Sequence, residues 1–278
     1  MMKILTQTQI SAYERCRYFY YLRNVRKLVW PIEAGESKNV RQGDDFHLLV
    51  RQLILGFPAE SLIVPEKDEN VRRWLDVYCS VQPLGSPEQV FAEKEVSLLF
   101  ADVLWLGKFD ALTVNDDRLT IYDWKTGSAR PEQEKYQKAP QTRLYRFLAR
   151  SCASRLIGAG LHAVPAENIE MVYWFPEYPD REVRLPYSEE EYQLDMTWIK
   201  TRAREMSSVE ESDYPRTQNT RHCRFCAYRT FCFTASDVSF REEEIPQEEP
   251  PELSGDIWQA GLFSPESFSE DEPEAVNF

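Results

Sequence analysis

One short segment limits the possible folds of this chain more than any other: residues 119–127, LTIYDWKTG, carry an aspartate and a lysine two positions apart within an apolar run. Side chains alternate between the two faces of a β-strand, so Asp123 and Lys125 share one face of the predicted strand. Burying two charges without compensation costs several kcal/mol. The pair is therefore either a structural ion pair at a strand end or part of a site where other polar groups converge.

The segments around this strand predict an α/β fold. Apolar runs at 90–100, 103–114 and 119–127 predict strands, and the turn sequence NDDR between the last two predicts a hairpin. Thr6 or Thr8 is the expected cap of a first helix. The other expected elements are helices over 8–22, 39–56, 68–79, 138–158 and 188–206 and strands over 169–176 and 181–187. Together these elements predict a central mixed β-sheet flanked by helices.

The acidic charge is concentrated at the C-terminal end. The 278 residues have a formal net charge of -13, but residues 241–278 hold 12 acidic residues against one arginine and so contribute -11. The rest of the chain is nearly neutral, which permits a locally basic groove for a polyanion. We expect a folded domain over residues 1–239 and a disordered acidic tail over 240–278. The apolar DIWQAGLF segment of the tail either docks on a protein partner or has no ordered role.

The sequence also predicts the cellular location of the protein and the role of its cysteines. No apolar run approaches the roughly 20 residues that cross a bilayer, and the N-terminus lacks a signal-peptide pattern, which predicts a cytoplasmic protein without a membrane partner. Cys223, Cys226 and Cys232 crowd into CRFCAYRTFC, which suggests metal ligation in a reducing compartment. Cys79 and Cys152 fall in helical patterns and are expected in the core.

A second acid is expected beside Asp123. Strand alternation places four residues of the run 103–114 on one face: Leu106, Lys108, Asp110 and Leu112. Asp110 therefore projects toward Asp123. With His47 from a helix and Lys125 nearby, the two acids form a site for a hard cation, Mg²⁺ or Mn²⁺, because such ions prefer oxygen ligands.

The order of these residues resembles a known family. His47 is followed by GKFD ending in Asp110, by DWK with Asp123 and Lys125, and by QTRLY. This order is similar to the PD-(D/E)XK nuclease superfamily and, more narrowly, to its RecB-like branch. The resemblance covers residues 5–235 and implies a restriction-endonuclease-like core. It also implies a metal-dependent deoxyribonuclease, an exonuclease acting on single-stranded DNA or DNA ends in repair, recombination or CRISPR adaptation.

The resemblance also implies a role for each site residue. His47, Asp110, Asp123 and the Trp124 carbonyl would bind one or two Mg²⁺ or Mn²⁺ ions, and Lys125 would orient a hydroxide and offset phosphate charge. Gln141 and Tyr145 share one helix face and would reach the lysine, the water or the phosphate.

The cysteine pattern narrows the resemblance further. Cys16 ahead of the nuclease motifs, with Cys223, Cys226 and Cys232 after them, is similar to the iron-sulfur members of the branch, the CRISPR-associated RecB-like exonucleases and the AddB nuclease domain. In those proteins four thiolates hold a 4Fe-4S cluster that pins the N-terminal helix to the C-terminal segment. Four thiolates suit zinc equally by count, and His222 is an alternative zinc ligand if Cys16 is not used.

Each assignment has a plainer alternative. His47 can be a half-buried histidine with satisfied hydrogen bonds, and Gln141 and Tyr145 can be ordinary surface and core residues. Asp102 precedes the G-x-x-D pattern and is not expected in the site, whereas Glu93 and Glu95 are expected on a solvated strand face, with a contribution of one of them to the site as the alternative. The whole protein can also be a catalytically weak or inactive DNA-binding scaffold stapled by Fe-S or zinc.

The basic and aromatic stretch over residues 14–30, ERCRYFYYLRNVRKLVW, has two interpretations as well. Its arginines and rings can hold the phosphates and bases of single-stranded DNA. Alternatively, the rings pack inside the domain and the arginines are exposed.

Overall fold

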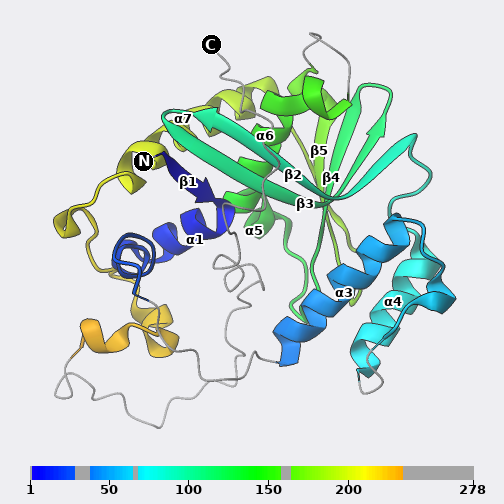
Figure 1. The fold of residues 1–278 in the computed structure, drawn as a ribbon, viewed down its shortest axis with the longest axis horizontal. Coiled ribbons are helices and arrows are strands. Elements are labelled where there is room, and N and C mark those ends of the chain that lie inside the picture. The colour runs from blue at the N-terminus through cyan, green and yellow to red at the C-terminus, as the bar shows by residue number, and fades with distance from the viewer. Residues whose placement is uncertain (1, 29–37, 65–67, 158–163, 234–278) are drawn as a thin grey trace.

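The computed structural model describes residues 2–28, 38–64, 68–157 and 164–233 (Figure 1). Its centre is a six-stranded mixed sheet, as predicted, in the order β1-β3-β4-β5-β6 with β2 on the other side of β3. β1 pairs with β3 and β4 with β5 in parallel, whereas the other pairs are antiparallel. The strands are β1 Lys3–Thr6, β2 Gln89–Phe100, β3 Val103–Asn115, β4 Arg118–Trp124, β5 Ile169–Trp174 and β6 Val183–Pro186. The predicted tail over 240–278 lies outside the described residues.

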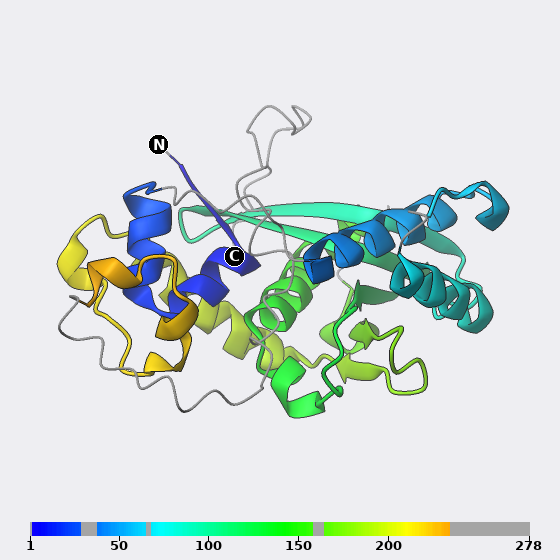
Figure 2. The same ribbon diagram turned by 90° about the horizontal axis from the view of Figure 1, so that it is seen from below.

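Helices cover both faces of this sheet and divide the core into two clusters. One cluster lies between the sheet and α1, α6 and α7, and the other lies between the sheet and α3 and α4. Figure 2 shows α3 and α4 side by side at one end of the molecule, away from α1 and α2. The helices are α1 Gln7–Arg15, α2 Arg17–Tyr20, the π-helix η1 Tyr21–Val25, α3 Lys38–Ile54, α4 Glu69–Val81, α5 Gln133–Gln137, α6 Pro140–Ile157 and α7 Glu189–Met206. Single 3₁₀ turns are η2 Ala59–Ser61, η3 Ala166–Asn168, η4 Glu211–Asp213, η5 Thr220–Phe225 and η6 Arg229–Phe231.

The helices predicted over 39–56, 68–79, 138–158 and 188–206 and the hairpin of β3 and β4 are confirmed, but β1 and α5 were not anticipated. β1 has only four residues and α5 only five, so neither carries a recognisable periodicity. In the described part of the chain, the helices all fall short of the length and apolar character that a membrane crossing requires.

The first helix begins where predicted but does not continue to residue 22. Thr6 caps α1 in a capping box with Gln9, whose N–H donates to the Thr6 hydroxyl at 3.4 Å. Cys16 then adopts an extended conformation, with φ -160° and ψ 113°, and separates α1 from α2. Its Sγ accepts the Phe19 N–H at 3.4 Å and thereby caps α2. The prediction of one continuous helix was wrong because hydrophobic periodicity does not register a single extended residue.

The middle strand β3 changes partners along one edge. Residues 103–106 pair with β1, and residues 111–115 pair with β4. Within the described chain, residues 107–110 have no strand partner on that edge. Helix α6 fills the space there: a Cβ on Gly107 would lie 2.8 Å from Leu148 Cδ1. The GKFD sequence therefore occupies a gap in the sheet, and its glycine permits the close approach of α6.

The gap also changes which way the β3 side chains point. On β4 the predicted alternation holds, because Ile121 lies in the α6-side cluster and Trp124 in the α3-side cluster. On β3, Ala111 belongs to the α3 side and Leu112 to the α6 side, while Asp110 contacts His47 of α3. The expected shared face of Asp110 and Leu112 was therefore wrong: two consecutive residues, 110 and 111, face α3.

Candidate active site

Asp110 joins α3, β3 and β4 at the gap in the sheet. Its Oδ2 accepts the Trp124 N–H at 2.8 Å, and its Oδ1 lies 3.3 Å from His47 Nδ1. His47 Nε2 in turn lies 3.1 Å from the Trp124 carbonyl oxygen. The β3–β4 ladder ends at Ala111–Tyr122, so the Asp110 carboxylate takes the N–H that a further ladder pair would have used. The Asp110 side chain therefore takes the place of a backbone hydrogen bond at the point where β3 and β4 separate.

Asp123 and Lys125 form a second group that points to α6. Lys125 Nζ lies 2.6 Å from Asp123 Oδ1, which confirms that the two charges are neighbours. Gln141 connects both, because its amide N–H donates to Asp123 Oδ2 and its Oε1 accepts from Lys125 Nζ at 3.1 Å. β4 ends at Trp124, so Lys125 follows the strand rather than belonging to it. Asp123 is only 3% exposed, whereas the Lys125 side chain is 16% exposed, so the network reaches the surface through the lysine.

Residues that the sequence did not single out support this network. Lys125 Nζ lies 5.4 Å from the centre of the Tyr173 ring. The Tyr173 hydroxyl lies 2.8 Å from Thr142 Oγ1, next to Gln141 on α6. Burial, followed by the charge of Asp123, raises the pKa of Tyr173, so the ring stays neutral beside the acid. Strand β5 therefore contributes to the site, and only its apolar pattern was visible in the sequence.

Tyr145 occupies a different position from Gln141 on the same helix. Its ring is buried and packs edge-on against Phe109 of β3, with the ring centres 5.0 Å apart. It also lies beside Gly107, where a Cβ would be 3.4 Å from the ring. The predicted helix face is therefore present, with Gln141 in the polar network and Tyr145 against the GKFD segment.

The electrostatic environment keeps Asp110 ionised. Burial alone raises the pKa of the Asp110 carboxyl. The positive charge and hydrogen bond of His47, the Trp124 N–H and the charge of Lys125 together outweigh burial and hold that pKa below its ordinary value. Asp110 is therefore available as an anionic oxygen ligand at neutral pH.

The donor set is chemically suited to a divalent cation. Binding to a cation would require the neutral form of His47, in which one ring nitrogen carries a lone pair. His47 Nε2 and the Trp124 carbonyl oxygen, which lie 3.1 Å apart, would both be ligands of such a cation together with the Asp110 carboxylate. Nevertheless, the described residues contain no group of three His, Cys, Asp or Glu side chains placed to hold a metal. Asp110 and Asp123 meet through the backbone at Trp124, and the Asp123 carboxylate is turned to Lys125.

The four predicted cluster ligands lie at the opposite end of the molecule, near enough to influence one another's ionisation, but within the described residues no three of them are placed to hold a metal. All six cysteines are free thiols. Burial raises the pKa of Cys223, Cys226 and Cys232, and the neighbouring thiols, Cys16 among them, raise each of these pKa values further. The chain ends are also in direct contact, because the Tyr228 hydroxyl donates to the Leu28 carbonyl. Cys16 is thus brought to the late cysteines across most of the sequence.

Two rings of the basic and aromatic stretch, Tyr20 and Tyr21, are buried in this contact. Together with Tyr13, just before the stretch, they pack against Tyr214 with 5.4 to 6.2 Å between ring centres. The Arg15 guanidinium stacks on Phe19 at 5.0 Å. The buried rings agree with the interpretation that they pack within the domain.

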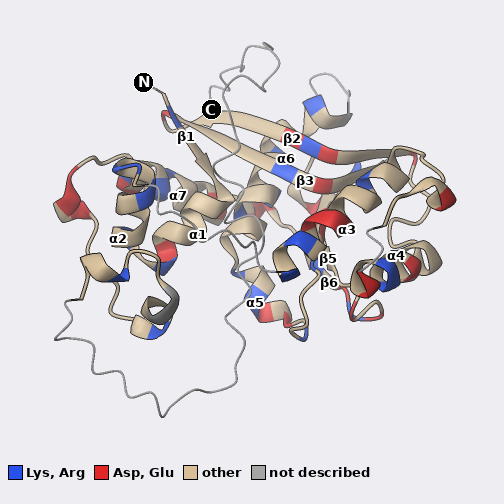
Figure 3. Ribbon diagram, turned by 60° about the horizontal axis from the view of Figure 1, so that its bottom comes forward, with Lys and Arg blue, Asp and Glu red and all other residues tan. Residues whose placement is uncertain are grey.

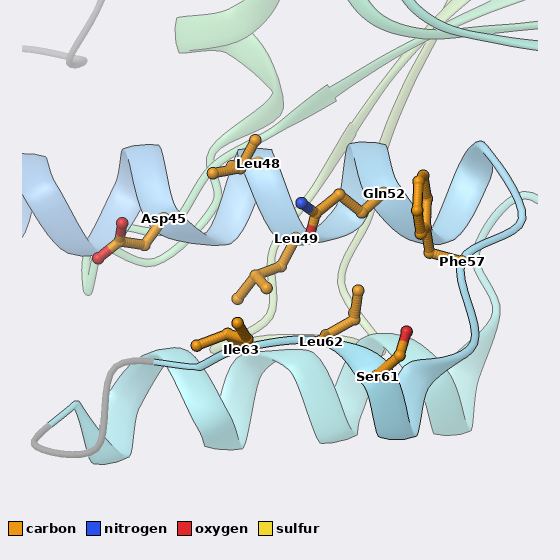
Figure 4. Close-up of a pocket in the computed structure, with 8 residues that line it drawn as sticks. All are labelled: Asp45, Leu48, Leu49, Gln52, Phe57, Ser61, Leu62 and Ile63. Carbon is orange, nitrogen blue, oxygen red and sulfur yellow. The ribbon is translucent and has the colours of Figure 1, made fainter.

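A cavity of about 350 Å³ lies elsewhere, between α3 and the segment that precedes α4 (Figure 4). Leu48, Leu49, Phe57, Leu62 and Ile63 form most of its wall. None of the candidate site residues lines it. The polar network at the sheet gap and this apolar cavity are therefore separate features.

Family comparison agrees with the geometry. A model of the PD-(D/E)XK nuclease superfamily matches residues 4–233. The chain belongs to the PD-(D/E)XK nuclease superfamily. This membership confirms the superfamily and the restriction-endonuclease-like core expected from the sequence, and it indicates a hydrolytic nuclease whose substrate is a nucleic acid. PD-(D/E)XK nucleases generally use divalent cations such as Mg²⁺ or Mn²⁺. No curated protein matches the chain.

A solved structure of similar fold is known. The "Putative exonuclease" from Eubacterium rectale has a TM-score of 0.54 at 9% sequence identity, and the alignment covers 89% of this chain and 91% of that one. At this identity the likeness concerns the fold. The protein SSO0001 aligns with a TM-score of 0.39 at 12% identity, over 84% of this PD-(D/E)XK chain and 87% of its own.

Proposed function

We propose that the protein is a Mg²⁺- or Mn²⁺-dependent deoxyribonuclease of the RecB-like branch. We expect it to be an exonuclease that acts on single-stranded DNA or DNA ends in repair, recombination or CRISPR adaptation. One observation carries the proposal: donors from α3, β3, β4 and α6 converge where β3 and β4 separate, in the residue order of the superfamily. The name of the Eubacterium rectale protein is consistent with an exonuclease.

The cation would be held by His47, Asp110, Asp123 and the Trp124 carbonyl. When bound, a divalent cation supplies Lewis-acid activation of a water and neutralises charge on the scissile phosphate. Asp110 also accepts the N–H of Trp124 and so anchors the residue whose carbonyl oxygen lies beside His47. Asp110 would thus be a ligand of the cation and would also position a second ligand, the Trp124 carbonyl.

Lys125 would contribute the positive charge next to the phosphate. Its ammonium is held between Asp123 and Gln141, so its position is fixed before substrate arrives. The positive charge of this ammonium would stabilise phosphate charge and help to orient the attacking water. Gln141 would act as a positioning residue for Lys125, while Tyr145 holds α6 against β3.

The cysteines would hold a 4Fe-4S cluster, with zinc as the alternative metal. Cys16, Cys223, Cys226 and Cys232 are free and close enough to influence one another, and the Phe19 N–H donates to Cys16 Sγ. Hydrogen bonds to sulfur are a normal part of iron-sulfur ligation. A cluster there would join the two ends of the domain.

A second candidate is a DNA-binding scaffold without efficient cleavage. It is favoured by one observation: among the described residues, the acids of the site are engaged by His47, Lys125 and Gln141 rather than grouped around a cation position. It predicts DNA binding with no cation-dependent hydrolysis.

Degradation of end-labelled single-stranded and duplex DNA, with Mg²⁺, Mn²⁺ or EDTA, separates the two candidates. We expect cation-dependent cleavage that Asp123→Asn and Lys125→Met each reduce by about 10³-fold, because both remove charge from a preorganised site. Asp195→Asn is a matched control, since Asp195 is also 3% exposed and is paired with Arg143 2.5 Å away. Cleavage that survives in both site variants would remove the proposed active site, and DNA binding without any hydrolysis would favour the scaffold.

A further inference from the structure

Glu93 of β2 has a backbone conformation that non-glycine residues rarely adopt, with φ at 47°. Its position across the sheet is specific. Ala92 pairs with Ala111 and Lys94 pairs with Phe109, so Glu93 lies opposite Asp110 at the one position where the ladder is interrupted. Strained residues of this kind persist where the surrounding structure fixes them, often at functional sites.

Two ion pairs of the Glu93 carboxylate hold this residue in its position opposite Asp110. Its Oε2 lies 2.8 Å from Arg51 Nη1 of α3 and 3.1 Å from Lys108 Nζ of β3. The sequence had suggested a solvated strand face for this acid, but the carboxylate instead bridges a helix and a neighbouring strand. Figure 3 shows charged stretches of β2 and β3 adjacent to α3.

The ion pairs of Glu93 with Arg51 and Lys108 lie next to the candidate active site and connect the same two elements, α3 and β3. Arg51 follows His47 by four residues on α3, one helical turn or about 6 Å. Lys108 precedes Asp110 by two residues on β3, about 7 Å. The two sites therefore lie side by side between α3 and β3. The distance between them corresponds to about one or two nucleotides of a nucleic-acid chain.

The group carries one net positive charge at a solvent-accessible position. The Arg51 and Lys108 side chains are 47% and 39% exposed. A guanidinium has five N–H donors and an ammonium has three, so each cation retains donors after bonding Glu93. Glu93 keeps both cations directed at one place, which lowers the entropy lost when they bind a common anion.

An open groove continues from this group. It has a volume of about 480 Å³ and lies between Ile54 and Leu55, at the end of α3, and residues 90–95 of β2, so that Lys94 lines it together with Glu93 and Glu95. In the described structure β2 pairs only with β3, so this groove follows an edge of the sheet. A nucleic-acid strand leaving the His47–Asp110 site along α3 would pass Arg51 and Lys108 and enter the groove.

We infer that Arg51 and Lys108, oriented by Glu93, form a phosphate-binding subsite for the nucleic-acid strand next to the scissile position. The inference rests on the proposed nuclease function, since it assigns a path to that substrate. Arg51 and Lys108 contact the phosphate, and Glu93 is a positioning residue. The subsite recognises the charge of the backbone and reads no base.

Binding of a fluorescent single-stranded oligonucleotide by the full chain in EDTA tests the subsite without cleavage. Arg51→Gln and Lys108→Gln should each weaken binding about fivefold and lower the slope of log affinity against log salt by about 0.7. Arg184→Gln is the matched control, because Arg184 is 45% exposed and is likewise paired with two glutamates. Unchanged affinity and slope in both subsite variants, or the same loss in Arg184→Gln, would overturn the inference.

Glu93→Gln separates positioning from a merely structural role. Removing the acid beside a bound phosphate should tighten binding about threefold while slowing cleavage, because the cations remain but are less well directed. Weaker binding together with a lower melting temperature would count against the positioning role. Failure of the nuclease assay with intact effects on binding and salt slope would reject the proposed catalysis and keep the subsite. Normal cleavage and binding in Arg51→Gln and Lys108→Gln would reject only the subsite.

Discussion

The two polar centres of this molecule are built differently. At the sheet gap, the side chains of His47, Asp110, Asp123 and Gln141 hold one another through direct contacts with the β4 backbone or with Lys125. At the other end, four thiols lie near one another as free cysteines, and the contacts that hold the chain ends come from tyrosine rings. The first centre is preformed by side-chain hydrogen bonds, whereas in the second the bond between two proposed ligands is a backbone one, from the Cys226 N–H to the Cys223 carbonyl at 3.2 Å.

This difference implies different responses to metal. A preformed network keeps its geometry when the cation leaves, because its members satisfy one another. Thiols brought together from Cys16 and the late cysteines gain stability from a cluster that closes a loop of about 200 residues in the unfolded chain. Cluster loss should therefore affect stability, and cation loss should affect mainly activity.

The largest stability effect is expected at Cys16. Cys16→Ala removes one ligand and one helix cap and should lower the unfolding free energy by about 3 kcal/mol, or the melting temperature by about 6 to 12 °C. Thermal unfolding of anaerobically purified protein, with its visible absorption, measures both stability and cluster content. Cys79→Ala is the control, since Cys79 is also partly buried but lies outside the thiol group. A coloured Cys16→Ala protein with the parent melting temperature would contradict the cluster assignment.

A smaller effect is expected from cations at the sheet gap. Mn²⁺ at about 100 times its dissociation constant should raise the unfolding free energy by about 2.7 kcal/mol through mass action. Asp110→Asn should remove this increase because it replaces an anionic ligand. Melting curves with and without Mn²⁺ measure the difference. An equal Mn²⁺ shift in the parent and in Asp110→Asn would place the cation elsewhere.

The smallest effect concerns the tyrosines that join the chain ends. Tyr214 is buried, its hydroxyl donates to the Ser208 carbonyl at 2.7 Å, and burial raises its pKa to about 12. The folded chain therefore keeps this proton above about pH 10, where an unfolded tyrosine loses it. Its contribution is fully present below about pH 10 and is lost as the pH rises toward 12, by at most about 1.4 kcal/mol per pH unit.

Urea unfolding at several pH values between 9 and about 12 tests this sign. Tyr214→Phe should show a shallower loss of stability over that interval than the parent chain. Identical slopes would mean that Tyr214 does not contribute, and that the junction depends on other groups.

Much of the fold follows from local patterns in the sequence. The stripe of Phe46, Leu49 and Val50 predicted α3, and the S-E-E-E start predicted α7, whose Glu191 N–H donates to Ser188 Oγ at 3.2 Å. The alternation of β4 predicted the contact between Asp123 and Lys125. These features depend on neighbours within one element, so a single sequence contains the information.

The predictions that were wrong concern features that depend on more than one helix or strand. β3 switches from β1 to β4 along one edge, and this switch turns Asp110 toward α3 against the simple alternation. The interruption of the first helix at Cys16 and the bridging position of Glu93 likewise depend on distant partners. The spacing of residues in the sequence does not show where along β3 its partner changes from β1 to β4.

The sequence by itself determined the residue types of the site, their order and the superfamily, because these follow from local chemistry and spacing. Only the tertiary structure decided how they meet: Asp110 through the Trp124 peptide, Asp123 through Lys125 and Gln141, and Arg51 with Lys108 through Glu93. The physical reason is that each of these contacts joins separate helices and strands, whose relative positions are set by packing in the two cores and by the gap in the sheet.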